Sequence, residues 1–522
     1  MGVARRDAGP ATWARVLAGH HVAVDGTTLI GVALTDNAAD QREQAALAGA
    51  WYRFETSLTR LAYGRWLWRF KSTWRGSSTA PVAGLGGSQP RNLHSNRRAR
   101  TDMKITDATR YTLHVPFYAK RVVQAMQRAQ THDERVTVYR IETDNGIVGW
   151  GDTQGHSADV SALRGQNPWA LINDDRIGSL GLQMAMLDVC GKDAGVPVHA
   201  LIGSKVRDRC PISWWDIDMS PADWAAEARE SVKRGHTSFK MKARPWRDIL
   251  QQVEAVGKVV PPDYRFDIDF NGFLLNAARA EMILHQLDEH PNVGMYESPF
   301  YLGGDLSGAR ILRERVRKPI VEHFVEAVLH NHASDGFVVG GMLNQTRRQA
   351  VLAAEFNKPF WLQLVGAGIT TAFAVHLGSV LSHAQLPYIT CSELWKHNLL
   401  KGKKLEVKDG HIQVPDGPGL GVEVDEKAVA RYTVDAGEPS PKERYRAKKR
   451  ILRVQWPAGG QHKRVWEFTD EGEYQKEFYN GSIPGFQTGV SLEVEEGEGS
   501  SAAFRREHAR IAAREASIAP TR

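Results

Sequence analysis

The sequence has few cysteines and no long apolar run. Its three cysteines lie far apart, form no Cys-x-x-Cys pair and are odd in number. This pattern argues against a disulfide scaffold or a zinc cluster and favours a reducing compartment. No apolar run reaches the ~18–20 residues of a membrane helix, and the Arg5-Arg6 pair is not followed by a clean apolar stretch. We therefore expect a cytoplasmic protein with no secretion signal and no membrane partner.

An excess of positive charge is confined to one end of the chain. The 522 residues carry 67 Lys+Arg against 60 Asp+Glu, for a formal net charge of +7. Such a balance suggests a nucleic acid or a membrane surface as partner. Nearly all of the excess falls within residues 1–102, and the rest of the chain is close to neutral. We therefore expect no nucleic-acid partner for the body of the protein.

Residues 1–102 have the composition of a basic, disordered extension. Trp51–Trp74 could form an aromatic-rich helix, but residues 76–100 are rich in Gly, Ser, Pro and Arg. Such a segment buries too little apolar surface to offset its ordering entropy. We interpret residues 1–102 as an extension, or as sequence upstream of a start at Met103, with a membrane-surface or nucleic-acid tail as the alternative.

The following segments predict an α/β fold made of a capping domain and a barrel. Residues 103–208 show two runs at strand period around an Asp144-Asn145-Gly146 turn and then helical spacing at 178–202, which indicates an α+β module. Residues 209–400 alternate short apolar runs with amphipathic helices. The eight runs are ISWW, TSFKMK, RFDIDF, VGMYE, PIVEH, DGFVV, PFWLQ and PYITC. Such alternation predicts a parallel (β/α) TIM barrel whose active site lies at the carboxyl ends of the strands.

Charged residues recur at those predicted strand ends. Lys240 and Lys242 lie two residues apart, so both point to one face, and their proximity lowers the pKa of one amine toward that of a general base. Three carboxylates follow at intervals of about one strand-plus-helix unit, at Asp269, Glu297 and Glu322. Converging carboxylates repel unless a cation binds them, and hard oxygen ligands select Mg²⁺.

These motifs resemble the enolase superfamily, in the mandelate racemase/muconate lactonizing enzyme family. The resemblance covers about Met103 to Val434 and rests on K-M-K at 240–242, D-F-N at 269–271, Y-E-S-P at 296–299, V-E-H at 321–323 and P-D-G-P-G-L-G at 415–421. It implies a modified barrel with an N-terminal cap, to which residues 401–435 return. It also implies that Mg²⁺ holds a substrate carboxylate and stabilises the enediolate formed when a base removes the α-proton.

The resemblance also implies roles for individual residues. By matched position, Lys242 is the base, Lys240 polarises the carboxylate, and Asn271 supports the site. Asp269, Glu297 and Glu322 become the metal ligands, with His323 as the alternative third ligand because the family places this ligand four or five residues after the strand-opening proline. Further substrate-binding candidates are His323, Gln363 and Glu393.

Departures from the family pattern narrow the expected reaction. Gly340-Gly341 stand where a second base would end strand six, and Gln363 stands where a histidine would end strand seven. Racemisation needs a base on each face of the enediolate, whereas loss of water can use one lysine as base and then acid. We therefore expect a lyase, a dehydratase of a small carboxylic acid such as an acid sugar. The acid partner could come from Glu393, Tyr118 or His156.

Alternatives stay open at this point. The chain could be a racemase, epimerase or cycloisomerase of the same superfamily, or a barrel that binds acids without converting them.

Residues 436–497 extend beyond the family pattern and predict a small β appendage, with a hairpin around Ala458-Gly459-Gly460. Residues 498–522 predict a frayed helix or a tail. We expect a homo-oligomer, with the appendage packed on a neighbouring surface.

Overall fold

The computed structural model describes most of the chain after residue 102 and four strands before it. The described residues are 21–25, 28–32, 51–60, 66–75, 103–129, 132, 134–155, 157–402, 405–457, 463–497 and 501–517. The chain divides into two compact units, Met1–Arg91 and Asn92–Arg522. Among the described residues, no helix is long and apolar enough to cross a membrane.

The first unit contains an antiparallel sheet. Its strands are β1 (His21–Asp25), β2 (Thr28–Val32), β3 (Trp51–Arg60) and β4 (Trp66–Arg75), in that order. The helix suggested for Trp51–Trp74 is wrong, because β3 and β4 pair from Trp51 opposite Arg75 to Arg60 opposite Trp66. Aromatic and β-branched residues favour a strand, and in β4 the aromatic residues alternate with basic ones. The other residues before 103 lie outside the described residues, so the disordered extension stays a prediction there.

The second unit begins with a capping domain. Strands β5 (Ile105–His114), β6 (Arg135–Thr143) and β7 (Val148–Thr153) form an antiparallel sheet, with the expected turn at Gly146, whose φ is 80°. Helix α4 (Lys120–Arg128) connects β5 to β6. Helix α6 (Leu180–Ala194) packs closely on β7, where a Cβ on Gly151 would overlap the carbonyl oxygen of Gly181. Strand β18 (Thr433–Val434) pairs with β5 and adds a fourth strand from after the barrel.

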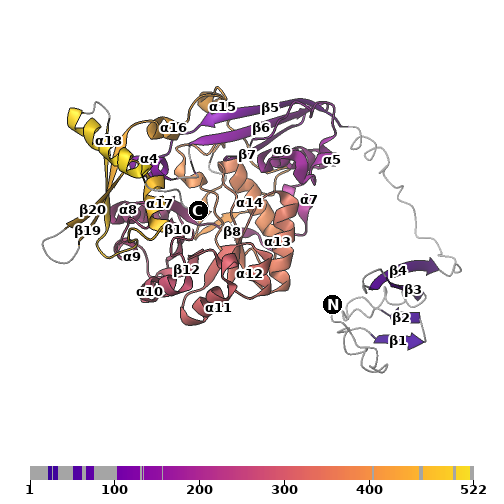
Figure 1. Cartoon of the computed structure of the whole chain (residues 1–522). Coiled ribbons are helices and arrows are strands. Elements are labelled where there is room, and N and C mark those ends of the chain that lie inside the picture. The colour runs from indigo at the N-terminus through magenta and orange to yellow at the C-terminus, as the bar shows by residue number, and fades with distance from the viewer. Residues whose placement is uncertain are drawn as a thin grey trace. The chain divides into compact units, whose positions relative to one another are not determined.

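The barrel is built from seven parallel strands and an eighth extended segment (Figure 1). The strands are β9 (Trp214–Ile217), β10 (Ser238–Lys242), β11 (Arg265–Asp269), β12 (Val293–Glu297), β13 (Ile320–His323), β14 (Gly336–Val339) and β15 (Phe360–Leu362). The eighth predicted run makes single parallel bridges on both sides, Gln363 with Ile389 and Ile212 with Tyr388. These bridges join the last strand to the first, and the predicted α/β barrel with a cap is confirmed.

Helices follow the barrel strands in the expected alternation. They are α8 (Pro221–Lys233), α9 (Ile249–Gly257), α10 (Ala277–Leu287), α11 (Leu306–Arg315), α12 (Glu326–His330), α13 (Leu343–Glu355) and α14 (Gly368–Val380). Large apolar side chains fill the interface between helices and sheet, as at Trp224 and Phe239, whose rings lie 6.4 Å apart and are both fully buried. Burial of both strand faces explains why the strands read as continuous apolar runs.

The C-terminal residues form an appendage that packs on the barrel and the cap of the same chain. Its sheet has the order β20-β19-β21, from β19 (Arg450–Pro457), β20 (Lys463–Phe468) and β21 (Ser491–Glu496). Helices α16 (Pro441–Arg446), α17 (Glu471–Tyr479) and α18 (Ala502–Ala516) complete it. The turn of the predicted hairpin lies outside the described residues. In Figure 1, α17 and α18 lie on the side of the barrel that carries α4 and α8.

Candidate active site

The predicted lysines and two of the predicted carboxylates meet at the carboxyl ends of neighbouring strands. Lys242 is paired in register with Asp269, and Asp269 with Glu297, which places the three side chains at one level of the barrel. Asp269 and Glu297 are fully buried, and Lys240 is 1% exposed. Parallel strands bring their carboxyl ends to one mouth, so spacing along the sequence becomes proximity in space.

Lys240 lies between the two buried carboxylates. Its Nζ is 2.5 Å from Glu297 Oε2 and 3.5 Å from Asp269 Oδ2, and it donates a 2.7 Å hydrogen bond to Gln363 Oε1. Burial acts to lower the pKa of Lys240, but the charges of Glu297 and Asp269 outweigh it and raise that pKa above its ordinary value. Lys240 is therefore a fixed ammonium group.

The pKa of Lys242 is shifted in the opposite direction. Its Nζ donates hydrogen bonds to Asp269 Oδ2 at 2.6 Å and to Asn271 Oδ1 at 3.1 Å. Burial lowers the pKa of Lys242 and Asp269 opposes it, but the positive charge of Lys240 adds to the lowering and the net pKa falls. Of the two lysines, Lys242 is the one that gives up its proton more readily, which suits a base.

A tight turn after β11 holds Asp269 and Asn271 in place. Asn271 has a φ of 45°, in the left-handed region that asparagine tolerates better than most residues. Its backbone N–H donates to Asp269 Oδ1 at 2.8 Å, while its side-chain oxygen accepts from Lys242. Burial alone would raise the pKa of Asp269, but Lys242 and Lys240 hold it well below its usual range. Asp269 is therefore a carboxylate.

Glu322 is not brought to the other carboxylates, which corrects the expectation of three converging acids. Val321 is the register partner of Glu297, so Glu322 faces the opposite side of β13 and His323 returns to the side of Glu297. The Glu322 carboxylate accepts hydrogen bonds from Ser298 Oγ at 2.6 Å and from the Leu302 N–H at 3.4 Å. His323 Nε2 instead lies 3.4 Å from Glu297 Oε1. The period of two of a strand thus selects His323 as the third side chain at the mouth.

The other predicted residues are distributed differently. Gln363 joins the cluster through Lys240. Glu393 lines a cavity of about 780 Å³ on the flank of the barrel with Arg234, His236 and Trp395, and burial raises its pKa to about 8. Tyr118 donates to Glu227 Oε1 at 2.6 Å rather than contacting a lysine. His156 lies outside the described residues.

Two basic residues near the mouth of the barrel were not predicted from the sequence. His132 of the cap packs edge-on against Trp215, with ring centroids 4.8 Å apart, and Trp215 is the register partner of Lys240. Burial lowers the pKa of His132 to about 3, and the positive charge of Lys242 adds to this effect. Arg244 donates to Asn271 Oδ1 at 3.2 Å, the same oxygen that Lys242 contacts. The K-M-K-A-R spacing could have indicated Arg244, whereas nothing local in the sequence indicates His132.

The donor set fits a hard divalent cation bound by few protein ligands. Two fully buried carboxylates share one level of the barrel, and neither Glu297 oxygen accepts a hydrogen bond of good geometry from the described residues. Mg²⁺ commonly binds one or two carboxylates and completes its shell with water and substrate. No group of three His, Cys, Asp or Glu side chains able to hold a metal occurs among the described residues. Of the three predicted carboxylates, the structure thus brings only Asp269 and Glu297 together.

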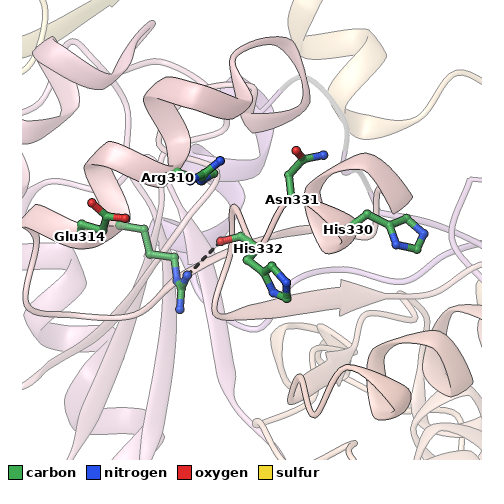
Figure 2. A pocket seen from close by; sticks show the side chains of 6 residues that line it. Arg310, Glu314, His330, Asn331 and His332 are labelled. Carbon is green, nitrogen blue, oxygen red and sulfur yellow. Dashed lines mark hydrogen bonds between the residues drawn. The ribbon is translucent and has the colours of Figure 1, made fainter. Parts of the chain in front are cut away.

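A second hollow lies at the other end of the barrel. Figure 2 shows Arg310, Glu314, His330, Asn331 and His332, which line it. Its volume is about 350 Å³. Arg313 also lines it and donates to the His332 carbonyl oxygen at 2.9 Å. These residues come from α11 and from the segment that precedes β14. None of them contacts the lysine and carboxylate cluster.

Comparison with known proteins decides the family. Residues 223–428, which contain K-M-K, D-F-N and Y-E-S-P, match the family model described as "Enolase C-terminal domain-like". Residues 223–428 therefore belong to the enolase superfamily. It is 24% identical over 372 residues to N-succinyl-L-Arg/Lys racemase of Bacillus cereus, which covers 64% of this chain and 98% of the relative. It is also 25% identical over 279 residues to muconate cycloisomerase 1-1 of Acinetobacter lwoffii, or 51% of this chain and 73% of the relative.

Other relatives place the chain among enzymes with different reactions. A D-galactonate dehydratase of Verminephrobacter eiseniae is 32% identical over 185 residues, 28% of this chain and 48% of that enzyme. The solved structure of the Bacillus cereus racemase superposes with a TM-score of 0.54 at 21% identity, over 63% of this chain and 98% of that one, which supports the fold. This chain is an enzyme. Its relatives are dehydratases, racemases and cycloisomerases, and enzymes of the superfamily generally use Mg²⁺.

Proposed function

We propose that this chain removes the α-proton of a small carboxylic acid with Lys242 and then eliminates a β-hydroxyl group as water. The observation that supports this proposal is that the pKa values of the two lysines are shifted in opposite directions. Lys240 is an ammonium group beside Glu297, whereas the pKa of Lys242 is lowered. One lysine can therefore bind the substrate carboxylate while the other accepts its α-proton.

The metal site follows from the same cluster. Asp269 and Glu297 would hold Mg²⁺, with His323 as the neighbouring third side chain. When bound, Mg²⁺ supplies positive charge that stabilises the enediolate. Lys240 adds to that charge, and Asn271 holds Lys242 in position. Both effects act in a buried site, where electrostatic interactions are stronger than in water.

Elimination needs no further base. Lys242 takes the α-proton, the electron pair forms the C=C bond, and the C–O bond at the β-carbon breaks. The Lys242 ammonium returns its proton to the departing hydroxide, giving water and an enol that becomes a 2-oxo acid. The ends of β14 and β15 carry Gly340, Gly341 and Gln363, none of which can act as a second base. This pattern favours a dehydratase of a hydroxy acid such as an acid sugar.

One observation favours epimerisation as a second candidate. His132 donates from Nδ1 to Gln154 Oε1 at 2.8 Å, which leaves Nε2 as the proton-accepting nitrogen of an uncharged imidazole. Its contact with Trp215 places it over the barrel interior from the side of the cap. If Nε2 faces the substrate opposite Lys242, the site has a base on each face.

A panel of aldonic and aldaric acids with Mg²⁺ separates the two candidates. The readout is 2-oxo acid formation, measured with semicarbazide, together with deuterium at the α-carbon in D₂O. We expect 2-oxo acid from at least one hydroxy acid, lowered about 10²–10⁴-fold by Lys242→Ala and unaffected by Lys258→Ala, whose side chain is exposed. Deuterium without 2-oxo acid, abolished by His132→Gln, would favour epimerisation. Neither signal from a folded, Mg²⁺-bound protein would refute both.

A further inference from the structure

Arg244 is a buried cation in the loop that follows β10. The residue is 9% exposed, and its Nη1 donates to the Ala243 carbonyl oxygen at 2.7 Å and to Asn271 Oδ1 at 3.2 Å. Within the part of the chain that the structure describes, no carboxylate lies within ion-pair distance of this guanidinium. The neighbouring Arg247 differs, because its Nε pairs with Asp218 Oδ1 at 3.0 Å. Asp218 and Asp269 attract this charge from beyond ion-pair distance. Burial of a cation without a directly paired anion is costly, so such a group is expected to bind an anion.

The position of Arg244 relates it directly to the proposed base. It follows Lys242 by two residues beyond the end of β10, and both side chains donate to the same oxygen of Asn271. Because they share this oxygen, the Lys242 ammonium and the Arg244 guanidinium lie close together, near enough for one small acid to contact both. Guanidinium groups bind carboxylates through two parallel hydrogen bonds, which makes arginine suited to recognising a carboxylate end.

The C-terminal appendage forms the wall behind this group. The Arg244 guanidinium lies 5.4 Å from the centre of the Phe273 ring, and Phe273 stacks on Tyr479 of α17 at 5.7 Å and 15°. The same loop is tied to the appendage where the Phe486 N–H donates to the Pro245 carbonyl oxygen at 2.8 Å. Arg244 is thus held between Asn271 of the barrel and an aromatic stack that residues beyond the cap-and-barrel portion complete.

We propose that Arg244 binds a second carboxylate of the substrate, at the end opposite the one whose α-proton is removed, so that the substrate is a small dicarboxylic acid. Tyr479 is a positioning residue, because it acts on Arg244 through Phe273. This inference rests on the proposed function for its orientation of the ligand. It adds a specificity that Lys240, Lys242 and the carboxylates do not provide, since these contact only the reacting end.

Matched acid pairs test the inference by direct binding. D-glucarate and D-gluconate, galactarate and D-galactonate, and L-tartrate and L-threonate differ within each pair by a terminal carboxylate in place of a hydroxymethyl group. Their dissociation constants are measured by calorimetry with Mg²⁺ on the Lys242→Ala protein, which should turn them over about 10²–10⁴-fold more slowly. We expect at least one dicarboxylate to bind 10- to 100-fold more tightly than its partner acid. Equal affinity within every pair overturns the inference.

Variants on this background then assign the preference to Arg244. Arg244→Met should abolish it, Arg244→Lys should restore part of it, and Tyr479→Leu should reduce it. Tyr479 is 47% exposed, so this last variant should fold. Arg265→Met at the other end of β11, where Arg265 is exposed and donates to the Pro262 carbonyl oxygen, is the matched control and should retain the preference. A preference that survives Arg244→Met in a protein with an unaltered thermal unfolding curve overturns the inference.

The proposed reaction and the proposed carboxylate site at Arg244 can be refuted independently. If a preference that depends on Arg244 is found but no acid exchanges its α-proton with the unmodified enzyme, the second carboxylate site stands and the proposed reaction falls. If acids do exchange their α-protons but mono- and dicarboxylates bind equally, the reaction stands and the assignment of Arg244 falls.

Discussion

Lys242 Nζ lies 2.6 Å from Asp269 Oδ2, so the proposed base and a proposed metal ligand are in direct contact. The contact fixes the lysine in the mouth of the barrel, and Asp269 in turn opposes the lowering of the Lys242 pKa that burial causes. The two residues are register partners at the ends of β10 and β11. In the proposed function, this one hydrogen bond would therefore couple proton abstraction by Lys242 to metal binding by Asp269.

Removing either buried carboxylate should weaken Mg²⁺ binding. Asp269→Asn and Glu297→Gln each delete one negative charge from the proposed metal site, and we expect the dissociation constant to rise at least tenfold, about 1.4 kcal/mol. Calorimetric titration with Mg²⁺ measures it. Asp208→Asn is the control, because Asp208 is an exposed carboxylate paired only with Lys205 in the described part of the chain. Equal affinities for all three variants would refute the proposed metal site.

The third side chain at the metal site should be His323 and not Glu322. His323 faces Glu297, whereas Glu322 is held by Ser298 on the other side of β13. His323→Leu should raise the Mg²⁺ dissociation constant, and Glu322→Gln should leave it within about twofold, because Gln keeps the acceptor for Ser298. Titration of both variants decides the matter, and the reverse order of effects would contradict the assignment.

Asp218 should be essential to the junction between the cap and the barrel. It accepts hydrogen bonds from Arg128 of the cap at 2.7 Å, from Trp246 at 2.7 Å and from Arg247 at 3.0 Å, and it is 2% exposed. Burial acts to raise the pKa of Asp218, but the two arginines outweigh it and lower the pKa. Asp218→Asn leaves two buried guanidinium groups uncompensated and should cost about 3–5 kcal/mol.

Urea unfolding measures the Asp218 effect. The matched control is Asp263→Asn, an exposed aspartate in the loop before β11, which should change the free energy of unfolding by less than about 0.5 kcal/mol. A loss below about 1 kcal/mol for Asp218→Asn would show that the junction does not depend on this carboxylate.

Buried histidines should make the fold sensitive to mild acid. Burial lowers the pKa of His236 to about 3 and of His376 to about 4, whereas an unfolded histidine titrates near ~6.5. Between pH ~6.5 and ~4 the unfolded chain binds more protons than the folded one, so stability falls as the pH falls, by up to ~1.4 kcal/mol per pH unit for each histidine. His236→Phe should reduce this slope in urea unfolding between pH 7.5 and 5.5, and His330→Phe, an exposed site, should not.

Much of this site can be predicted from the sequence, because its residues lie at the end of the strand in successive strand-plus-helix units. Lys242, Asp269 and Glu297 end successive strands, so one strand-plus-helix period predicts their convergence. The length of the strand-plus-helix unit does not reveal which of two adjacent residues at a strand end faces the interior of the barrel. Glu322 was expected at the mouth for its oxygen chemistry, and the alternation of β13 places His323 there instead.

Residues that reach the site from the cap and the appendage could not be predicted from the strand-plus-helix spacing. His132 comes from the cap, and Tyr479 from the appendage, more than 230 residues after Arg244 along the chain. Their contacts depend on how separate modules dock, which no local pattern encodes. For the same reason, Glu393 follows the eighth segment as expected yet lines a cavity on the flank of the barrel.

The most direct test of the account is α-proton exchange by Lys242. The enzyme is incubated in D₂O with Mg²⁺ and each acid of the panel, and deuterium at the α-carbon or its loss into product is followed by NMR. The account predicts exchange or elimination with at least one acid, and a decrease of about 10²–10⁴-fold in the Lys242→Ala variant. Unchanged exchange in a folded Lys242→Ala protein that still binds Mg²⁺ would contradict it.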